Sequence, residues 1–397
     1  MATPNISAVL KLIQSDEFDD SSMVRKSPFL TSIKHEKDFA GEAFKFSVQH
    51  SGLGGRSHDS VIAEGNDVGG GYAAFTVSSV SDFKLGKLDG QTTRKALNAG
   101  VTEKFVKYVA NEMKQTYASL NAELARGACA SSTGSRGQVG SFSGSTITMK
   151  RTDDSMYVSI GDVLRVSATD GGAHRTGSVT VLGVNTATGV ITTTAAVTSG
   201  ISAIANDDYI YVSGDLNKSW SGLGAWCPAS DPSPAENFYG VDRSVNPEFL
   251  AGLRYAGTGT NTETVLIRAA AYARKRPSDA FEKFKVVCSE EDFASVQVAK
   301  EGARVIDDDN QYGIGVQTFM LGSAPVMPDP FCPSGTYFIV GDGAFELHTN
   351  DGVVIDEADG NQIRRTAGDT YSFMGLVDGQ FVAPKPYGIL RGLWPAG

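Results

Sequence analysis

The chain has 397 residues, 41% of them hydrophobic and 20% charged, which is enough for two or three folded domains and unlike a disordered protein. Its formal net charge is −10 and no stretch gathers Lys and Arg, which argues against a protein that binds nucleic acid tightly. No run reaches the roughly 18 apolar residues of a spanning helix, and Met1 to Gln14 lacks the pattern of a signal peptide. We therefore expect no membrane partner.

The first 43 residues contain too few apolar side chains to form a core of their own. A short amphipathic helix is predicted from about Asn5 to Gln14, and Pro28 in Ser27-Pro28-Phe29-Leu30 predicts an end to regular structure. We expect an arm that lies on a larger body.

Residues 44–85 have the pattern of a two-stranded ribbon. Phe44, Phe46 and Val48 alternate with polar residues, which is the two-residue period of a strand, and a less regular apolar series at Tyr72, Phe75, Val77 and Phe83 marks the returning side. The glycines between residues 52 and 55 are followed by neither Lys-Ser/Thr nor a helix, so they predict a flexible tip and not a phosphate-binding loop.

Residues 101–126 give the clearest helix, because apolar residues recur every three or four positions from Val101 to Leu124. Gly127 is expected to cap its end. Residues 141–216 then change in composition, with 12 threonines, 10 serines and a single lysine, Lys150. Five short strands are predicted there, which indicates a small barrel or sandwich. They lie at 146–149, 162–167, 178–184, 190–194 and 209–212.

Residues 217–335 return to a mixed α/β pattern. Asn246-Pro247 opens a short helix, 261–276 fits a longer one, 285–288 fits a buried strand, and Ser289 with Asp292 fits a capping box that begins a helix over 290–300. The C-terminal part is extended. A strand is predicted at 336–340, a shorter one at 344–348, a turn at Asn350-Asp351-Gly352, and two long extended segments after it.

Reactive chemistry is nearly absent from the sequence. There is no nucleophile elbow, phosphate-binding loop or zinc-protease motif, and the five histidines have no metal-like spacing. The run Asp307-Asp308-Asp309-Asn310 lacks the spaced ligands of a calcium loop. Four widely separated cysteines are typical of reduced, half-buried thiols. We expect no catalytic residue, cofactor or metal, although carboxylates that meet only in three dimensions leave a glycosidase open.

Taken in order, these features resemble the major capsid proteins of tailed bacteriophages with the Hong Kong 97-type fold. The resemblance covers nearly the whole chain except 141–216. The individual motifs are weakly specific, and the resemblance rests on their order and spacing. In chain order they are Pro28-Phe29-Leu30, the extended loop, the long helix, the stretch from Phe238 to Ser244, the stretch from Gly322 to Val326, and the C-terminal ribbons that end at Arg391.

The resemblance implies an α+β fold in which each segment has a place. The expected parts are an N-terminal arm (1–43), an extended β-ribbon loop (44–85), a peripheral domain with a spine helix at 101–126 (86–140 and 352–385), an inserted small all-β module (141–216), and an axial α/β domain (217–351 and 386–397). Because the arm begins almost at Met1, the resemblance implies a separate scaffolding protein or none.

The implied function is that of a shell subunit and not of an enzyme. Copies would assemble through hexamers and pentamers into the icosahedral capsid of a virion, in the host cytoplasm, around double-stranded DNA that they do not bind tightly. Portal and decoration proteins are further expected partners. The alternatives are a nanocompartment shell of the same fold, whose chains are typically shorter and lack a Thr/Ser-rich module, or a carbohydrate-acting enzyme or binding protein built on the β-rich part.

The ribbon is the expected place of contact between subunits. Its apolar side chains would be exposed if it projected freely, and such patches usually mark contact sites. The alternative is that it folds back on its own domain. With Arg56 available for a partner's carboxylate, the expected contact residues are Phe46, Val48, Gly54, Gly55, Arg56, Phe75 and Val77.

Overall fold

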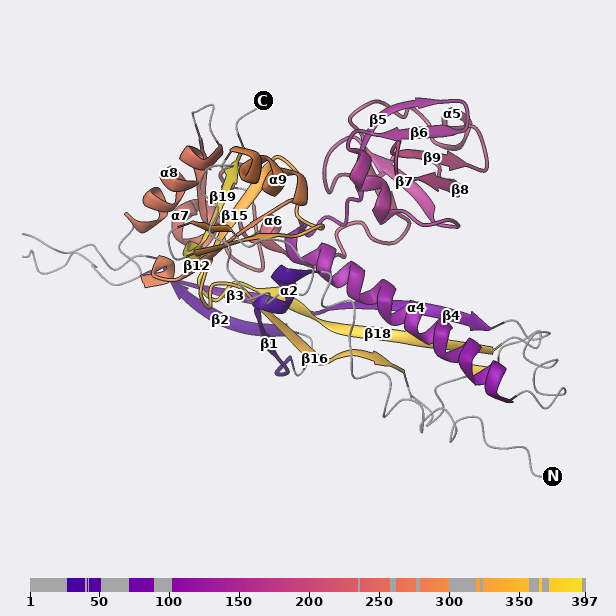
Figure 1. Cartoon of the computed structure of the whole chain (residues 1–397), viewed down its shortest axis with the longest axis horizontal. Coiled ribbons are helices and arrows are strands. Elements are labelled where there is room, and N and C mark those ends of the chain that lie inside the picture. The colour runs from indigo at the N-terminus through magenta and orange to yellow at the C-terminus, as the bar shows by residue number, and fades with distance from the viewer. Residues whose placement is uncertain are drawn as a thin grey trace, which may run out of the picture. The chain divides into compact units, whose positions relative to one another are not determined.

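A computed structural model of the chain describes residues 27–39, 41, 43–50, 71–88, 102–234, 236–257, 262–275, 279–299, 319–321, 324–356, 364–365 and 371–394 (Figure 1). The chain divides into two compact units. Ala130–Ala225 is one of them, which we call the barrel unit. Met1–Cys129 and Trp226–Gly397 together form the other, which we call the main unit.

A long helix lies against a long, mostly antiparallel sheet in the main unit (Figure 1). The helix is α4 (Thr102–Cys129), and the sheet has the order β1 (Lys34–Glu36), β16 (Glu346–Ile355), β18 (Tyr371–Val382) and β17 (Arg364–Arg365), with β4 (Val80–Leu88) also paired to β18. Met113, Leu120 and Leu124 give α4 a buried stripe. A Cβ on Gly375 of β18 would lie 2.8 Å from the side chains of Leu120 and Thr116, so a glycine there lets the helix approach the sheet.

A second sheet of the main unit mixes parallel and antiparallel pairs and contacts two helices. Its order is β11 (Leu253–Ala256), β19 (Ile389–Leu393), β15 (Thr336–Gly341), β12 (Phe284–Cys288), β14 (Ala324–Pro328) and β13 (Phe319–Leu321). The two helices are α8 (Thr262–Arg274) and α9 (Glu290–Ala299), and they share one apolar core with the strands. Every residue of β15 is buried, which explains its continuous apolar run.

Shorter elements complete the main unit. The arm contributes α2 (Pro28–Ser32) and β1, and a separate two-stranded sheet consists of β2 (Ala43–Gln49) and β3 (Tyr72–Ser78). The remaining turns of helix are α6 (Leu223–Trp226), which crosses from the barrel unit, η3 (Arg243–Val245), α7 (Pro247–Leu250), η4 (Asp279–Phe281) and η5 (Pro386–Gly388).

The barrel unit is a closed six-stranded barrel. Its order is β10 (Tyr209–Val212), β5 (Gly137–Ser143), β6 (Thr146–Met149), β9 (Val190–Thr193), β8 (Val179–Asn185) and β7 (Val163–Ser167), with η2 (Thr152–Tyr157) and α5 (Val197–Gly200) between strands. Buried Val, Ile, Leu and Met side chains fill its interior. The five predicted strands are present, but β5 begins before residue 141. An ion pair of 2.8 Å between Arg136 and Asp215 also joins segments near the two ends, so the predicted boundary at 141 is too far inside the unit.

Four local predictions were wrong for identifiable reasons. Pro28 opens α2 instead of ending regular structure, because its missing N–H costs nothing at the first helical position. Gly127 lies inside α4, which continues to Cys129. Residues 350–352 are not a turn, since β16 runs through them with a bulge between Thr349 and Val353. The ribbon also ends earlier than residue 85, because β4 starts at Val80 and joins the long sheet.

Candidate subunit-contact site

The base of the ribbon is a regular antiparallel pair. β2 and β3 pair from Ala43 with Ser78 to Gln49 with Tyr72, and burial alternates along both strands as the two-residue period requires. The inward side chains of β3 are Ala73, Phe75 and Val77, all of them buried, whereas Tyr72 is exposed. The ribbon therefore has one apolar face, and that face is covered at its base.

Trp226 is the centre of the cluster that covers the ribbon base. Its ring lies 5.4 Å from that of Phe75 and 6.1 Å from that of Phe46, which itself stacks on Phe75 at 5.3 Å. The indole Nε1 donates a hydrogen bond of 3.1 Å to the carbonyl of Phe381 in β18, so the polar edge of the buried ring is paired. Thr76 N also donates to the carbonyl of Tyr239 (2.9 Å). The ribbon base is thus fixed to the chain's own core.

This arrangement corrects part of the predicted contact set. Val48, Phe75 and Val77 are at most 3% exposed within the chain itself, so they have no free side-chain surface to offer a neighbouring subunit. Phe46 is half-buried. Gly54, Gly55 and Arg56 lie outside the described residues. Sequence reasoning missed Trp226, which lies about 150 positions from Phe75 and stands in no recognisable motif.

A buried carboxylate attaches the arm to the main unit. Oδ2 of Asp329 accepts hydrogen bonds from Ser27 Oγ (2.7 Å) and from the backbone N–H of Phe29 (3.2 Å), and Oδ1 accepts one from Phe331 N (2.9 Å). Ser27 Oγ also accepts from Leu30 N, which caps α2. Burial raises the pKa of Asp329, and the three hydrogen bonds oppose that shift. Phe29 and Leu30 are buried, which shows that this part of the arm lies on the main unit.

The arm is attached a second time where it joins the long sheet. β1 pairs in parallel with β16, with Lys34 opposite Glu346 and Glu36 opposite His348. The buried imidazole of His348 has its Nδ1 2.6 Å from Oδ1 of Asp38, and its Nε2 3.3 Å from Oε2 of Glu346. Its ring also lies 4.6 Å from that of Phe44, so one histidine contacts the arm and the ribbon base together.

A buried arginine holds the segment that follows the barrel unit. Arg243 is 2% exposed, and its guanidinium lies 3.9 Å from the ring centre of Phe238 and pairs with Glu236. Its Nη1 donates to the carbonyl of Trp226 (3.5 Å). The predicted stretch from Phe238 to Ser244 is therefore a structural element of the ribbon-base cluster, with Tyr239 in the left-handed backbone region at φ 51°.

A hollow of about 480 Å³ lies beside the arm. Its lining includes Phe29, Ile33, Lys34, Lys285, Asp342 and Glu346. Lys285 donates a hydrogen bond to the carbonyl of Ser32, and burial lowers the pKa of its ammonium group. Because its described hydrogen bond goes to the arm's own backbone, Lys285 stabilises the arm.

The described residues offer little for catalysis. No group of three or more His, Cys, Asp or Glu side chains that could hold a metal ion occurs among them. All four cysteines are free and buried, where half-buried thiols were expected, and burial raises the pKa of the Cys227 thiol to about 11. Among the same residues, no helix is long and apolar enough to cross a membrane.

Comparisons with known proteins were made by sequence and by structure. No protein-family model matches the sequence, and no curated protein matches it. Solved structures similar to the chain include the cyanophage A-1(L) capsid asymmetric unit, at 12% identity over 92% of this chain and 89% of that one, with a TM-score of 0.48. The capsid of an empty GTA particle is similar at 10% identity, 94% and 97% coverage and a TM-score of 0.44. The phage G major capsid and decoration proteins are similar at 8% identity, 91% and 88% coverage and a TM-score of 0.41. All three are structures of capsids or capsid proteins.

Proposed function

We propose that this chain is a major capsid protein of a tailed bacteriophage, and that its copies assemble through hexamers and pentamers into an icosahedral shell. The arrangement of the main unit supports the proposal most. A 28-residue helix lies along a long, mostly antiparallel sheet, and β19, near the end of the chain, returns to a separate mixed sheet. We assign these parts to the peripheral and axial domains of a Hong Kong 97-type fold, with the barrel unit as an insertion between them.

The two attachments of the arm and the buried ribbon base fit a subunit that is preformed before assembly. The apolar side chains of the arm attachments and of the ribbon base are buried within the chain, so the monomer needs no partner to cover them. The segment from residue 51 to 70, which contains Gly54, Gly55 and Arg56, joins the two ribbon strands, and we retain it as the proposed contact with a neighbouring subunit. Replacing residues 52–70 with a short Gly/Ser turn should preserve the Trp226 cluster and prevent closed shells.

The acidic composition supports a shell that encloses DNA without gripping it. A genome that is packaged and ejected must slide, and a net charge of −10 provides few cations to neutralise phosphates. We expect assembled shells to bind duplex DNA with a shallow salt dependence. A scaffolding protein, a portal and decoration proteins complete the proposed set of partners, with assembly in the host cytoplasm.

Electron microscopy of the purified full chain tests the function directly. A shell protein should give hexamers, pentamers or closed particles in negative stain, and analytical ultracentrifugation should show the same species in solution. A stable monomer or small oligomer over a wide range of concentration and ionic strength would contradict the proposal. Six or more phosphate contacts would make the DNA affinity fall steeply as the salt concentration rises. Such a fall would contradict only the expectation that the shell binds DNA weakly, and it would leave the proposed shell function standing.

A further inference from the structure

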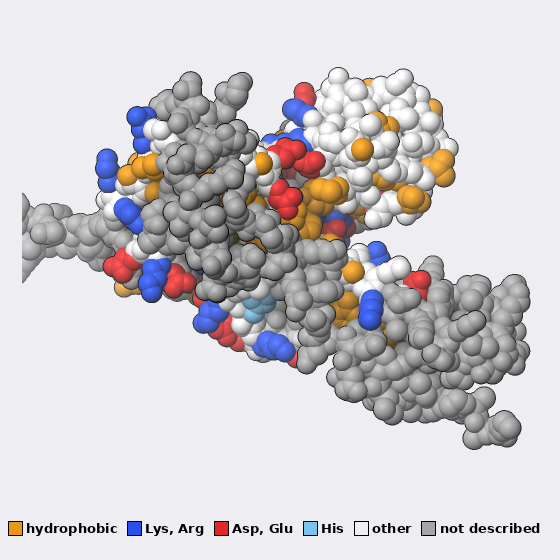
Figure 2. Space-filling view, viewed as in Figure 1, with side chains coloured by type: hydrophobic (Ala, Val, Ile, Leu, Met, Phe, Trp, Pro, Cys, Tyr) orange, Lys and Arg blue, Asp and Glu red, His pale blue; other side chains and the backbone are white. Residues whose placement is uncertain are grey.

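One side of the barrel unit has no charged residue. From Thr176 to Asn206 the chain contains no Asp, Glu, Lys, Arg or His, although 20% of all its residues are charged. This stretch forms β8, β9 and α5. In Figure 2 the corresponding side of the barrel is white and orange, with no blue or red side chains. We call this surface the uncharged face, and Ile160 and Val163 lie at its border, beside Asp162 and Arg165.

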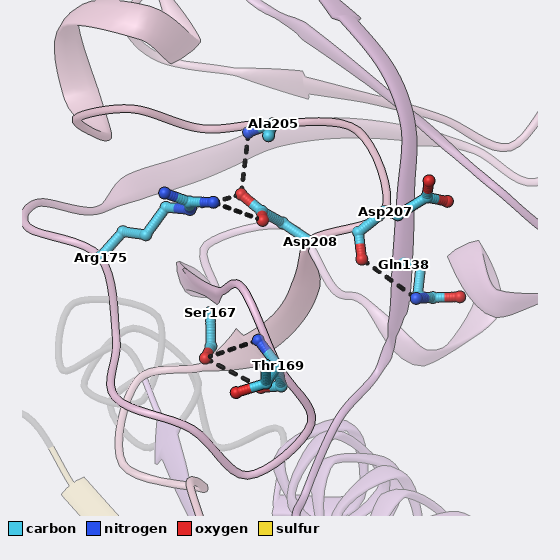
Figure 3. Close-up of polar contacts among 7 residues, drawn as sticks. All are labelled: Gln138, Ser167, Thr169, Arg175, Ala205, Asp207 and Asp208. Carbon is cyan, nitrogen blue, oxygen red and sulfur yellow. Dashed lines mark hydrogen bonds and ion pairs between the residues drawn. The ribbon is translucent and has the colours of Figure 1, made fainter.

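Several charged groups of the barrel unit pair with one another elsewhere. Arg175 binds Asp208 through two hydrogen bonds of 2.6 and 2.7 Å, and Oδ2 of Asp208 also accepts from Ala205 N (Figure 3). Asp207 pairs with Lys150, and its carbonyl accepts from the Gln138 side chain, as Figure 3 also shows. These two ion pairs are thus formed within the unit.

Three exposed apolar side chains lie on the uncharged face or at its border. Ile160 is 72% exposed, Leu182 60% and Val163 37%. Gly161 N donates to the carbonyl of Val181 (3.0 Å), and Val181 N donates to that of Asp162 (2.9 Å), so the segments that carry Ile160 and Leu182 lie side by side.

Leu182 points outward by the ordinary alternation of β8, in which Val179 and Val181 are buried, and it also lies at a β-bulge. Val181 pairs with Thr193 and Gly183 with Thr192, so Leu182 is the extra residue between them. A bulge redirects a side chain and interrupts pairing. A strand in a closed barrel does not need such a residue to bury its core, because the flanking Val181 and Val179 already point inward. β8 therefore presents a leucine to the outside at a point where its pairing with β9 is interrupted.

The composition of this face indicates what it binds. The cores of protein interfaces are depleted in charge, and Leu182 with Ile160 supplies an apolar centre. Its other side chains are mostly Thr, Ser and Asn, which both donate and accept hydrogen bonds, so two identical faces are complementary to each other. Because each copy carries a net charge of −10, two copies meet with least repulsion through a surface without charge. A partner protein of opposite charge would instead be recognised through acidic residues.

We propose that the uncharged face is a contact between two copies of this chain. The contact would be isologous, with the same face contributed by each copy. The proposal rests on the proposed function in one respect: if the chain forms a shell, the two contacting copies are subunits of that shell. It gives the barrel unit a specific role, which is to connect subunits through Leu182 and Ile160.

Cross-linking of the full chain tests the contact. The four native cysteines are buried, so Leu182→Cys adds one accessible thiol at the centre of the face. Ala168→Cys is the matched control, because Ala168 is exposed and follows the last residue of β7, about 17 Å from Val163 at the other end of that strand. A short bismaleimide should give covalent dimers with Leu182→Cys and at least about tenfold fewer with Ala168→Cys. Equal yields from the two variants, or no dimers from Leu182→Cys, would overturn the proposal.

Charge insertion provides the second test. Leu182→Asp places a carboxylate at the apolar centre of both copies, and we expect at least about tenfold weaker association through this face, since an unpaired charge at a contact is strongly unfavourable. Ala168→Asp adds the same charge elsewhere on the barrel and should assemble as the wild type does. Circular dichroism checks that both variants are folded. Normal assembly of a folded Leu182→Asp variant overturns the proposal. If the wild-type chain forms no shells at any concentration, the proposed function fails, and the cross-linking yield still decides whether the contact exists.

Discussion

The two units of this chain differ in how far apart in sequence their contacting residues lie. In the barrel unit every strand pairs with two others within one continuous segment, Ala130–Ala225. In the main unit the arm meets residues from the far end of the chain, as Ser27 does with Asp329 over a separation of 302 positions. Closing long loops costs more conformational entropy and slows folding. The comparison suggests that the barrel unit forms its structure locally, whereas the main unit requires both parts of the chain.

The cores of the two units also differ, both in the type of buried side chain and in the sequence distance between the residues in contact. The buried cluster of the barrel unit consists of Val, Ile, Leu and Met side chains. The ribbon base of the main unit is held by a few aromatic rings centred on Trp226, each of which contacts residues distant in sequence. A single substitution at that centre should therefore damage the main unit and leave the barrel unit intact.

Trp226→Ala should have the largest effect on stability. Removing a fully buried indole costs about 3–5 kcal/mol, and here it also leaves the Phe381 carbonyl without its donor. Thermal unfolding followed by calorimetry should show the main-unit transition at a lower temperature and the barrel transition unchanged. Trp226→Phe is the milder control. A shift of both transitions together would mean that the two units unfold as one.

Gly379→Ala tests the long sheet with the addition of one methyl group. A Cβ at this position of β18 would lie 2.2 Å from the carbonyl oxygen of His348 and 2.9 Å from Cα of Thr349, so the backbone of β16 would have to move. We expect a loss of about 2–3 kcal/mol in the main unit. Gly183→Ala is the matched control, because a Cβ there meets no atom within 4 Å, and it should change stability by less than about 0.5 kcal/mol. Denaturant titration measures both.

The elements that could be predicted from the sequence are those set by local patterns. Ser289 caps α9 as expected, because its Oγ accepts from Asp292 N (3.1 Å), and the same hydroxyl donates to Asp292 Oδ2 (2.8 Å). The strands of the barrel were found because short runs of strand-forming residues, such as those in β7 and β8, are separated by turn signals such as Asp170-Gly171-Gly172 and Thr188-Gly189. Such signals lie within about ten residues of one another, so one sequence is sufficient to read them.

The elements that could not be predicted depend on partners distant in sequence or on local irregularity. β5 was missed because Gly137 and Gly140 weaken the strand pattern, although Gly140 is needed where a Cβ would lie 3.0 Å from Cα of Lys150. The ribbon face was expected to contact a neighbouring subunit, because nothing in residues 44–85 indicates that Trp226 of the same chain covers it. For the same reason, the alternation of Phe46 and Val48 predicted a buried face correctly without revealing which chain buries it.

Tyr211→Phe examines the barrel unit by itself. The buried hydroxyl of Tyr211 donates to Oδ1 of Asp170 (3.0 Å) and accepts from Gly171 N (2.8 Å), and its removal leaves both without this partner. We expect a loss of about 1–2 kcal/mol that is confined to the barrel transition. Tyr209→Phe, in the same strand at a partly exposed position, should have a smaller effect. If Tyr211→Phe lowers the main-unit transition instead, the view of two separately stabilised units is wrong.

The smallest effect we predict is a pH dependence at the arm. Burial raises the folded-state pKa of Asp329 above its ordinary value near 4, so the folded state holds this proton more tightly than the unfolded chain does. Its contribution to the stability of the main unit is therefore complete below about pH 4, and it is lost as the pH rises through the raised pKa. Asp329→Asn removes the titration and keeps a similar shape beside Ser27.

The comparison of wild type and Asp329→Asn isolates this one group. Relative to the variant, the wild-type main unit should become less stable between about pH 4 and the raised pKa, whereas the difference should be constant below that window. Unfolding temperatures across the pH range measure it, and the barrel transition provides an internal reference because Asp329 belongs to the main unit. A wild type that gains stability over the variant as the pH rises would mean that the hydrogen bonds from Ser27, Phe29 and Phe331 outweigh burial. Asp329 would then hold the arm as a carboxylate.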